Sequence, residues 1–156
     1  MFVHQYMNPT VVTATPNMTL PDALQMMQEC HIRRLPVLDK DHQLVGIVSE
    51  RDILHSSPSP ATSLSVWELN YLWAKLHVKE IMTSPVTTIA KDAKVEEAAH
   101  LMIEHKIGGL PVVDENEEEV VGIITETDLF HALMNVHRSR PEMDLFLLGE
   151  IPMTMP

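Results

Sequence analysis

The sequence is poor in several residue types and features, and each shortage excludes a class of protein. Cys30 is the only cysteine, so no intrachain disulfide and no cysteine-rich metal cluster are expected. No apolar run approaches the roughly 18 residues that a membrane-spanning helix requires. The N-terminus also lacks the basic segment and long apolar stretch of a secretory signal. We therefore predict a soluble, cytoplasmic protein with no membrane partner.

Basic residues are scarce as well. The chain has 11 Lys and Arg against 22 Asp and Glu, for a formal net charge of -11. General binding to nucleic acid or to anionic membranes depends on clustered basic side chains, so neither is predicted. Residues 1–60 hold four basic and six acidic side chains, whereas residues 82–137 hold three basic and eleven acidic ones. Anion binding is therefore expected to depend on the first part of the chain.

What the chain does contain is an internal repeat. Residues 7–55 and 82–131 share one pattern, offset by 75 positions in its first part and by 76 after a one-residue insertion in the second copy. A unit of about fifty residues is too small to bury a stable core alone. We therefore expect the two copies to share a core, with their common chemistry near the junction.

Hydrophobic periodicity and turn signals predict the order β-α-β-β-α in each copy, and hence an α/β fold. In the first copy the strands are predicted at 11–13, 35–38 and 44–48, and the helices at 19–31 and from about 49 or 50. In the second copy the strands are predicted at 86–89, 110–113 and 120–125, and the helices at 95–106 and 126–136. The predicted boundaries are residues 1–60 for the first repeat and 82–137 for the second.

Residues 61–81 link the repeats, and residues 138–156 form a C-terminal tail. Apolar residues at helical spacing over 65–76 predict a linker helix. Its aromatic residues Trp67, Tyr71 and Trp73 either cap the shared core or form a dimer contact, since Trp and Tyr are enriched at interfaces. The tail is rich in apolar residues, so we expect it to contact the body of the protein, a second subunit or another partner.

Each repeat contains a glycine, two aliphatic residues, Ser or Thr, two variable residues and then Asp. Gly46 to Asp52 and Gly122 to Asp128 follow this pattern, which places a hydroxyl and a carboxylate one helical turn apart where a strand leads into a helix. A carboxylate can accept hydrogen bonds from both hydroxyls of a ribose, while the Ser or Thr hydroxyl and the first N–H groups of the helix can donate to phosphate. The pattern is also close to a plain capping box, so it leaves ligand binding and helix capping open.

Adjacent cations favour ligand binding. Arg33 and Arg34 precede Leu-Pro-Val in the first repeat, where a structural role would not require two cations, and Arg51 lies within the Ser/Thr-x-x-Asp turn. The planar guanidinium group can donate two hydrogen bonds to one phosphate. A solvated arginine pair is the alternative.

Taken together, these features resemble tandem CBS motifs, the arrangement called a Bateman module, over about residues 7–137. The resemblance rests on the element order, on Leu-Pro-Val in each repeat, and on Gly-Ile-Val-Ser-Glu-Arg-Asp with Gly-Ile-Ile-Thr-Glu-Thr-Asp. The linker over 63–72 further resembles stand-alone CBS-pair proteins of the bacterial acetoin-utilisation type. The resemblance implies two repeats packed about a pseudo-twofold axis, and a homodimer.

The same resemblance implies two composite clefts that bind an adenosine-containing ligand such as AMP, ADP, ATP or S-adenosylmethionine, with magnesium considered as a companion of ATP. The residues implied for the first cleft are Thr13, Ile32, Arg33, Arg34, Pro36, Thr125, Thr127 and Asp128. Those implied for the mirror cleft are Ser49, Arg51, Asp52, Thr88, Ile107, Gly108 and Pro111. Because Gly108 and Gly109 stand where the first repeat has its arginine pair, the first cleft is expected to favour phosphates and the second to bind more weakly or to take a less charged ligand.

The predicted function is a non-catalytic sensor that modulates an unidentified partner protein. The histidines show no His-Glu-x-x-His spacing, and no nucleophile lies in a recognisable elbow, so neither an enzyme nor a metal site is predicted. The acidic turn over 114–119 lacks the ligand spacing and glycine of a calcium loop. The alternative function is a structural protein-interaction module without a nucleotide ligand.

Overall fold

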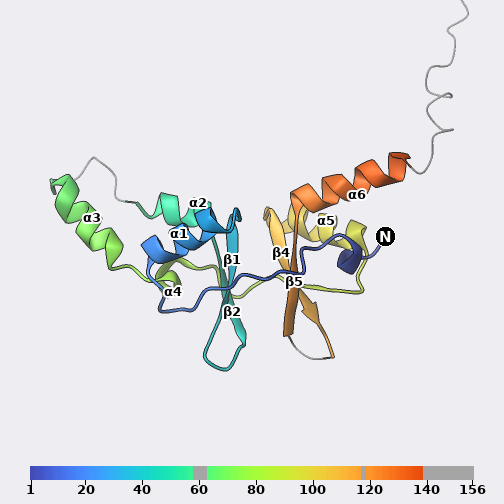
Figure 1. Ribbon diagram of the computed structural model, residues 1–156, viewed down its shortest axis with the longest axis horizontal. Coiled ribbons are helices and arrows are strands. Elements are labelled where there is room, and N and C mark those ends of the chain that lie inside the picture. The colour runs from blue at the N-terminus through green and yellow to red at the C-terminus, as the bar shows by residue number, and fades with distance from the viewer. Residues whose placement is uncertain (58–62, 117–118, 139–156) are drawn as a thin grey trace, which may run out of the picture.

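The two sequence repeats form two similar halves that lie side by side (Figure 1). The structure is a computed structural model, which describes residues 1–57, 63–116 and 119–138. In each half a β-hairpin points to one side of the molecule and the helices lie on the other. The predicted α/β class and the pair of packed repeats are confirmed.

The first half contains α1 (Leu20–Glu29), β1 (Arg34–Leu38), β2 (Leu44–Ser49) and α2 (Glu50–His55). Thr19 caps α1, since its hydroxyl accepts a hydrogen bond from the Asp22 N–H at 3.3 Å. β1 and β2 pair antiparallel. Asp39 Oδ1 organises their turn by accepting from the Asp41 and Gln43 N–H groups, each at 2.9 Å. The helix and hairpin predictions are confirmed here.

The second half contains β3 (Ile89–Ala90), α5 (Val95–His105), β4 (Gly109–Asp114), β5 (Glu119–Thr125) and α6 (Glu126–Arg138). β3, β4 and β5 form a three-stranded sheet in which β3 pairs parallel with β4 and β4 pairs antiparallel with β5. The helix and hairpin predictions are confirmed in this half too.

The first predicted strand of each repeat is wrong in position and length. In the first repeat only Ala14 pairs with β1: its N–H donates to the Pro36 carbonyl, and its own carbonyl accepts from Leu38. Extending this parallel ladder back to Val12 would require an N–H from Pro36, which proline lacks. Pro111 stops β3 in the same way in the second repeat, because Ile89 is the first residue that pairs with β4.

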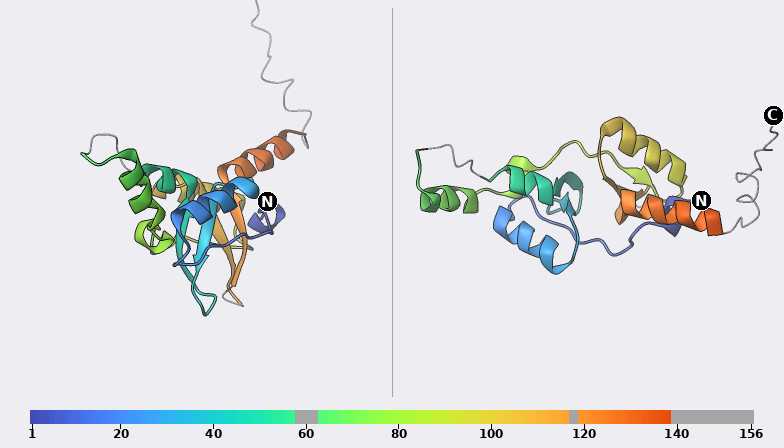
Figure 2. Two further views of the ribbon diagram at one scale, coloured as in Figure 1. Left: turned by 60° about the vertical axis from the view of Figure 1, so that its left-hand side comes forward. Right: turned by 90° about the horizontal axis from the view of Figure 1, so that it is seen from above.

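Each half is completed by the segment at the N-terminal end of the other repeat. The 3-10 helix η1 (Val3–Gln5) packs in the second half, and Asn8 exchanges two backbone hydrogen bonds with Ile123 of β5, at 2.9 and 3.0 Å. Reciprocally, Thr83 exchanges two with Ile47 of β2, at 2.9 and 3.1 Å. Figure 2 shows the N-terminal segment running from the second half across to the first. The chain therefore crosses between the halves twice.

The buried apolar residues form two clusters, so the expectation of one shared core is wrong. One cluster belongs to the first half and the other to the second, and each includes residues of the exchanged segment. The first includes Leu20, Met27, Leu35, Val48, Ile53 and Val78 of α4 (Val78–Ile81), and the second includes Val3, Met102, Leu110, Val112 and Ile124. The exchanged segments supply the apolar surface that a fifty-residue unit lacks.

The segments that cross between the halves explain why a glycine occupies the same motif position in both repeats. A Cβ atom at Gly46 would lie 2.3 Å from Met82 Sδ, and one at Gly122 would lie 2.5 Å from Met7 Sδ. Met7 and Met82 occupy equivalent positions in the two crossing segments. Each glycine therefore lets a methionine of the exchanged segment lie directly against the hairpin.

Replacing Gly122 with alanine should lower the free energy of unfolding by about 1–3 kcal/mol. The added Cβ would lie 3.0 Å from the Asn8 carbonyl oxygen, a backbone atom that cannot move without breaking the pairing with Ile123. Gly46→Ala is the matched control, because its three nearest atoms all belong to the Met82 side chain. Urea unfolding should show the larger loss for Gly122→Ala, and equal losses would contradict the backbone explanation.

The linker helix α3 (Val66–Ala74) forms as predicted, but most of its apolar surface is exposed. Ser65 caps it by accepting from the Glu68 N–H at 3.3 Å. Trp73 packs on the first cluster and donates from Nε1 to Ser56 Oγ at 3.3 Å, whereas Trp67 is 86% and Tyr71 62% exposed. The capping role therefore applies to Trp73 alone, and the dimer contact stays a prediction. The predicted contact role of the tail lies outside the described residues.

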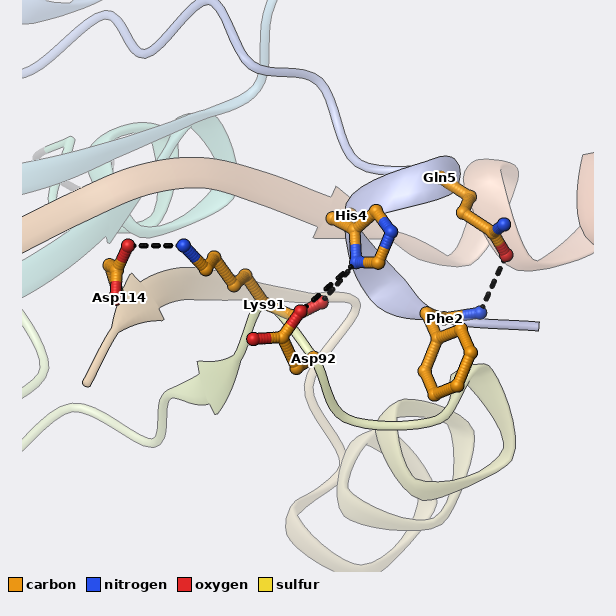
Figure 3. Close-up of polar contacts among 6 residues, drawn as sticks. All are labelled: Phe2, His4, Gln5, Lys91, Asp92 and Asp114. Atoms are coloured by element: carbon orange, nitrogen blue, oxygen red, sulfur yellow. Dashed lines mark hydrogen bonds and ion pairs between the residues drawn. The ribbon is translucent and has the colours of Figure 1, made fainter. Parts of the chain in front are cut away.

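Polar contacts attach the N-terminal segment to the second half (Figure 3). His4 Nδ1 lies 3.4 Å from Asp92 Oδ1 and 3.1 Å from the Lys91 carbonyl oxygen. The Lys91 ammonium group pairs with Asp114, whose side chain is buried and also accepts from the Asn116 N–H at 3.0 Å. The hydrogen bond from Lys91, followed by that from Asn116, lowers the pKa of Asp114 below its ordinary value of 3.8.

This lowered pKa predicts a contribution of Asp114 to acid sensitivity. The carboxylate stabilises the fold fully above pH 3.8, and the contribution is lost as the pH falls below that value towards the folded pKa. Thermal unfolding followed between pH 2.5 and 6 should therefore show a smaller acid-induced fall in melting temperature for Asp114→Asn than for the unmodified protein. Parallel curves for the two proteins would show that Asp114 is not responsible.

Candidate functional site

The hydroxyl and carboxylate of each Ser/Thr-x-x-Asp pattern contact each other at the start of a helix. In the first repeat the Asp52 N–H donates to Ser49 Oγ at 3.0 Å, and the Ser49 N–H donates to Asp52 Oδ2 at 2.9 Å. This is a reciprocal capping box. It leaves the Ser49 hydroxyl hydrogen available to donate to a ligand.

The second repeat uses its hydroxyl differently. Both the N–H and the hydroxyl of Thr125 donate to Asp128 Oδ2, each at 2.7 Å. The Thr125 hydroxyl hydrogen is thus already used within the cap. In both repeats Oδ2 makes the cap, and no hydrogen bond to Oδ1 occurs among the described residues, so capping leaves one carboxylate oxygen for a ligand.

Backbone bonds hold the second motif of each repeat beside this helix start. The Glu50 N–H donates to the Arg33 carbonyl at 2.8 Å, and the Glu126 N–H donates to the Gly108 carbonyl at 3.2 Å. Arg34 and Gly109, the next residues, begin β1 and β4. The arginine pair therefore lies next to the Ser49 cap, and the glycine pair next to the Thr125 cap.

A left-handed residue precedes each of these strands. His31 and Lys106 both have φ of 54°, although neither is glycine. They end α1 and α5 at equivalent positions of the repeat and turn the chain towards the strand. Each also lines a pocket between the halves.

The smaller pocket, of about 400 Å³, is named the Asp128 pocket. It is composite, as the resemblance implied: residues of the first repeat face the start of α6. Of the residues expected in the first cleft, the following line it: Ile32, Arg33, Arg34, Pro36, Thr125, Thr127 and Asp128. Thr13 does not, and Val11 and Val12 occupy that wall instead. The segment that the sequence predicted as a strand is therefore pocket wall.

The larger pocket, of about 800 Å³, is named the Asp52 pocket. Of the residues expected in the mirror cleft, the following line it: Ser49, Arg51, Asp52, Ile107 and Gly108. Thr88 and Pro111 do not, and Val86 and Thr87 form the corresponding wall. The same displacement occurs in both repeats, because the prolines at 36 and 111 leave the preceding segment unpaired.

The expected distribution of cations between the pockets is wrong. Arg51 is the only cation among the residues implied for the mirror cleft, yet Arg33, Arg34 and Lys106 also line the Asp52 pocket. None of these four basic side chains forms an ion pair with another described residue. The Asp52 pocket, and not the Asp128 pocket, therefore has the larger set of cations available to an anion.

The sequence comparison missed Lys106 and Glu126. Lys106 stands opposite His31 under the 75-residue offset, so aligning the residue before each Ile would have revealed it. Glu126 lines both pockets, which only the folded chain shows. In the described ranges no group of three or more His, Cys, Asp or Glu side chains could hold a metal ion. Nor does any helix there reach the length and hydropathy needed to cross a bilayer.

Known proteins share this architecture. The chain is 35% identical over 137 residues to a CBS domain-containing protein of Dictyostelium discoideum, which covers 87% of this chain and 93% of the relative. An uncharacterized protein of Methanocaldococcus jannaschii is 29% identical over 154 residues, covering 96% of this chain. This chain spans only 55% of that relative's length.

Three solved structures are similar. A putative acetoin utilization protein (AcuB) from Vibrio cholerae has a TM-score of 0.71 and 33% identity, covering 91% of this chain and 96% of that one. CBSX2 of Arabidopsis thaliana in complex with AMP has a TM-score of 0.70 and 30% identity, covering 88% of this chain and 98% of that one. The CBS domain pair of protein MJ0100 was solved in complex with 5'-methylthioadenosine and S-adenosylmethionine. It has a TM-score of 0.68 and 28% identity, covering 87% of this chain and 98% of that one.

The description of the matching family model is CBS domain, and it matches the chain twice, at residues 3–59 and 78–135. Each match contains one hairpin, one Ser/Thr-x-x-Asp helix start and one wall of each composite pocket. The resemblance to stand-alone CBS pairs of the acetoin-utilisation type is likewise confirmed by the Vibrio structure. The chain belongs to the CBS domain family, as a tandem CBS pair.

Proposed function

We propose that the protein is a non-catalytic regulatory module that binds adenosine-containing ligands in the two pockets between its repeats and thereby modulates a partner. The observation that carries this proposal concerns the described residues: each pocket combines a capping carboxylate, one oxygen of which makes no hydrogen bond to them, with arginine or lysine side chains that form no ion pair with them. Ribose hydroxyls can donate to the carboxylate while a phosphate accepts from the guanidinium groups.

The relatives narrow the class of ligand. CBSX2 has been solved with AMP, and the CBS pair of MJ0100 with 5'-methylthioadenosine and S-adenosylmethionine. All of these ligands share the adenosyl group. We propose AMP, ADP, ATP or S-adenosylmethionine for this chain, with magnesium as a companion of ATP to be tested. A phosphate-bearing ligand should prefer the Asp52 pocket, where Arg51 and Lys106 are added and the Ser49 hydroxyl can donate.

Calorimetric titration with AMP, ADP, ATP and S-adenosylmethionine, each with and without magnesium, tests the proposal. Asp128→Ala should abolish binding in the Asp128 pocket while lowering the free energy of unfolding by only about 1 kcal/mol, the usual value of a lost cap. Ser65→Ala in α3 is the matched control, because it removes a cap far from both pockets. Absence of binding to every ligand in the panel would overturn the proposal.

The second candidate is an interaction module with empty pockets. Its supporting observation is that Asp52 and Asp128 are already satisfied as helix caps, while Trp67 and Tyr71 of α3 are exposed. Under this candidate, Asp128→Ala costs stability and changes no ligand affinity. The same two measurements, stability and binding, therefore separate the candidates.

A further inference from the structure

The two pockets are not independent, because part of their lining is the same. Four residues line both of them: Arg33, Arg34, Gly108 and Glu126. Arg33 and Arg34 are also the only Lys or Arg side chains that line the Asp128 pocket within the described ranges. A phosphate in that pocket must therefore use cations that the Asp52 pocket also presents.

The glycine pair of the second repeat makes this sharing physically feasible. A Cβ atom at Gly108 would lie 2.3 Å from Arg34 Nη2 and 3.2 Å from Glu126 Oε2. One at Gly109 would lie 3.1 Å from Arg34 Cδ. Arg34, which begins β1 of the first repeat, thus lays its side chain over the start of β4 in the second. The absence of side chains at 108 and 109 creates the space for its guanidinium group.

The charged side chains that line each pocket predict which pocket binds a phosphate group first and so engages Arg34. The Asp52 pocket adds Arg51, Lys106 and His55 to the shared pair, with Glu50 as one further carboxylate, whereas the Asp128 pocket adds His31 and no further Lys or Arg among the described residues. A phosphate should therefore settle first in the Asp52 pocket. Once one edge of the planar guanidinium group donates to that phosphate, the group is turned towards the Asp52 pocket and presents fewer of its five N–H groups to a second phosphate. The two anions also repel each other.

We propose that Arg34 couples the two pockets antagonistically. A phosphate-bearing ligand in the Asp52 pocket recruits the Arg34 guanidinium group and so weakens binding of a second phosphate-bearing ligand in the Asp128 pocket, but not of an uncharged adenosine ligand. This inference rests on the proposed function. A charged hydrogen-bonding group typically changes affinity by about 10-fold to 100-fold, which sets the expected weakening of the second ligand by the first. The effect is reciprocal, as any coupling between binding sites must be.

The experiment is a calorimetric titration of the full chain with AMP, followed by titration of adenosine into the protein carrying one AMP. We expect the second AMP to bind at least 10-fold more weakly than AMP binds to the Asp128 pocket of an Asp52→Ala variant, in which the Asp52 pocket is left empty. The adenosine affinity should be the same with and without the first AMP. Gly108→Ala is the informative variant, because its Cβ displaces the flexible end of Arg34 without removing any charge. Measured against Gly108→Ala combined with Asp52→Ala, the weakening of the second AMP should fall to less than about threefold.

Arg34→Gln should weaken the first AMP and also remove the weakening of the second. Gly109→Ala is the matched control, because its Cβ would lie nearest Arg34 Cδ at 3.1 Å and Nε at 3.4 Å rather than the terminal Nη2, and it should keep most of the weakening. A single AMP site that becomes two in Gly108→Ala would support the coupling. A second AMP constant equal to that of Asp52→Ala, a weakening that survives in both Gly108→Ala and Arg34→Gln, or a single site in the unmodified protein and in both of these variants would overturn it.

The outcomes also separate this inference from the proposed function. Binding of S-adenosylmethionine without binding of AMP would overturn the coupling and leave the proposed function standing. Two independent AMP sites would do the same. Absence of binding by AMP, adenosine and S-adenosylmethionine would overturn both.

Discussion

Replacing both Arg51 and Lys106 with glutamine is expected to weaken AMP binding in the Asp52 pocket by about 100-fold, and each single replacement by about 10-fold. Both residues line that pocket alone, both side chains are exposed at its mouth, and neither forms an ion pair with another described residue. Each is therefore available to donate a charge-assisted hydrogen bond to phosphate. Adenosine, which carries no phosphate, should lose little affinity.

The measurement requires a protein in which AMP binds to the Asp52 pocket alone. Calorimetry on an Asp128→Ala background meets this requirement, with the three lysine and arginine variants compared within that background. Lys40→Gln is the control for net charge, because Lys40 is exposed in the turn of the first hairpin and lines neither pocket. If Lys40→Gln weakened AMP binding as much as Arg51→Gln, the effect would be general electrostatics and the assignment of the phosphate site would be wrong.

Deleting residues 1–7 is expected to destabilise the second half of the molecule, although these residues lie at the N-terminal end of the first repeat. Val3 is completely buried in the second cluster, and Tyr6 and Met7 pack against it. Burying one apolar side chain is worth about 1.5–3 kcal/mol, so after the ordering cost the deletion should lower the free energy of unfolding by about 3–5 kcal/mol. Val3→Ala should account for about 2 kcal/mol of this.

Amide hydrogen exchange shows which half of the molecule residues 1–7 stabilise. In the deletion variant, amide protection should fall in β4 and β5, whereas β1 and β2 should keep theirs, because their cluster includes Val78 of the other exchanged segment and no residue of 1–7. Loss of protection confined to the first hairpin would show that the N-terminal segment belongs to the first half. Val78→Ala is the reciprocal variant and should reduce protection in β1 and β2.

Much of the local structure followed from the sequence, because its determinants lie close together in the chain. The linker helix forms within the range that its apolar spacing predicts, and the Asp39 turn closes the predicted first hairpin. The failed strand predictions have their cause on a neighbouring strand. The strand over 11–13 did not form because Pro36 lacks the N–H that the ladder needs. Spacing and apolar pattern alone do not reveal such a missing donor on a neighbouring strand.

Most residues that line the candidate site could be named from the sequence, but the distribution of basic side chains between the two pockets could not. Most residues named from the repeats and the family resemblance line one of the two pockets, and their roles towards a ligand stay predictions. Comparing Arg33 and Arg34 with Gly108 and Gly109 suggested that the arginine pair serves the first cleft alone. That comparison treats a side chain as belonging to its own repeat, whereas the long side chain of Arg34 crosses the junction to Gly108 and Gly109.

By itself, the sequence determined the duplication, the order of elements in each repeat, the helix caps and the types of residue available for a ligand. These properties depend on hydrophobic periodicity and on turn and cap residues, which act between residues that are close in the chain. Only the tertiary structure decided that segments 1–8 and 76–83 complete the opposite halves, that two cores form, and that Arg34 lies over Gly108 and Gly109. Those outcomes depend on which surfaces meet in space, where burial of apolar area and room for a long side chain are settled between distant residues.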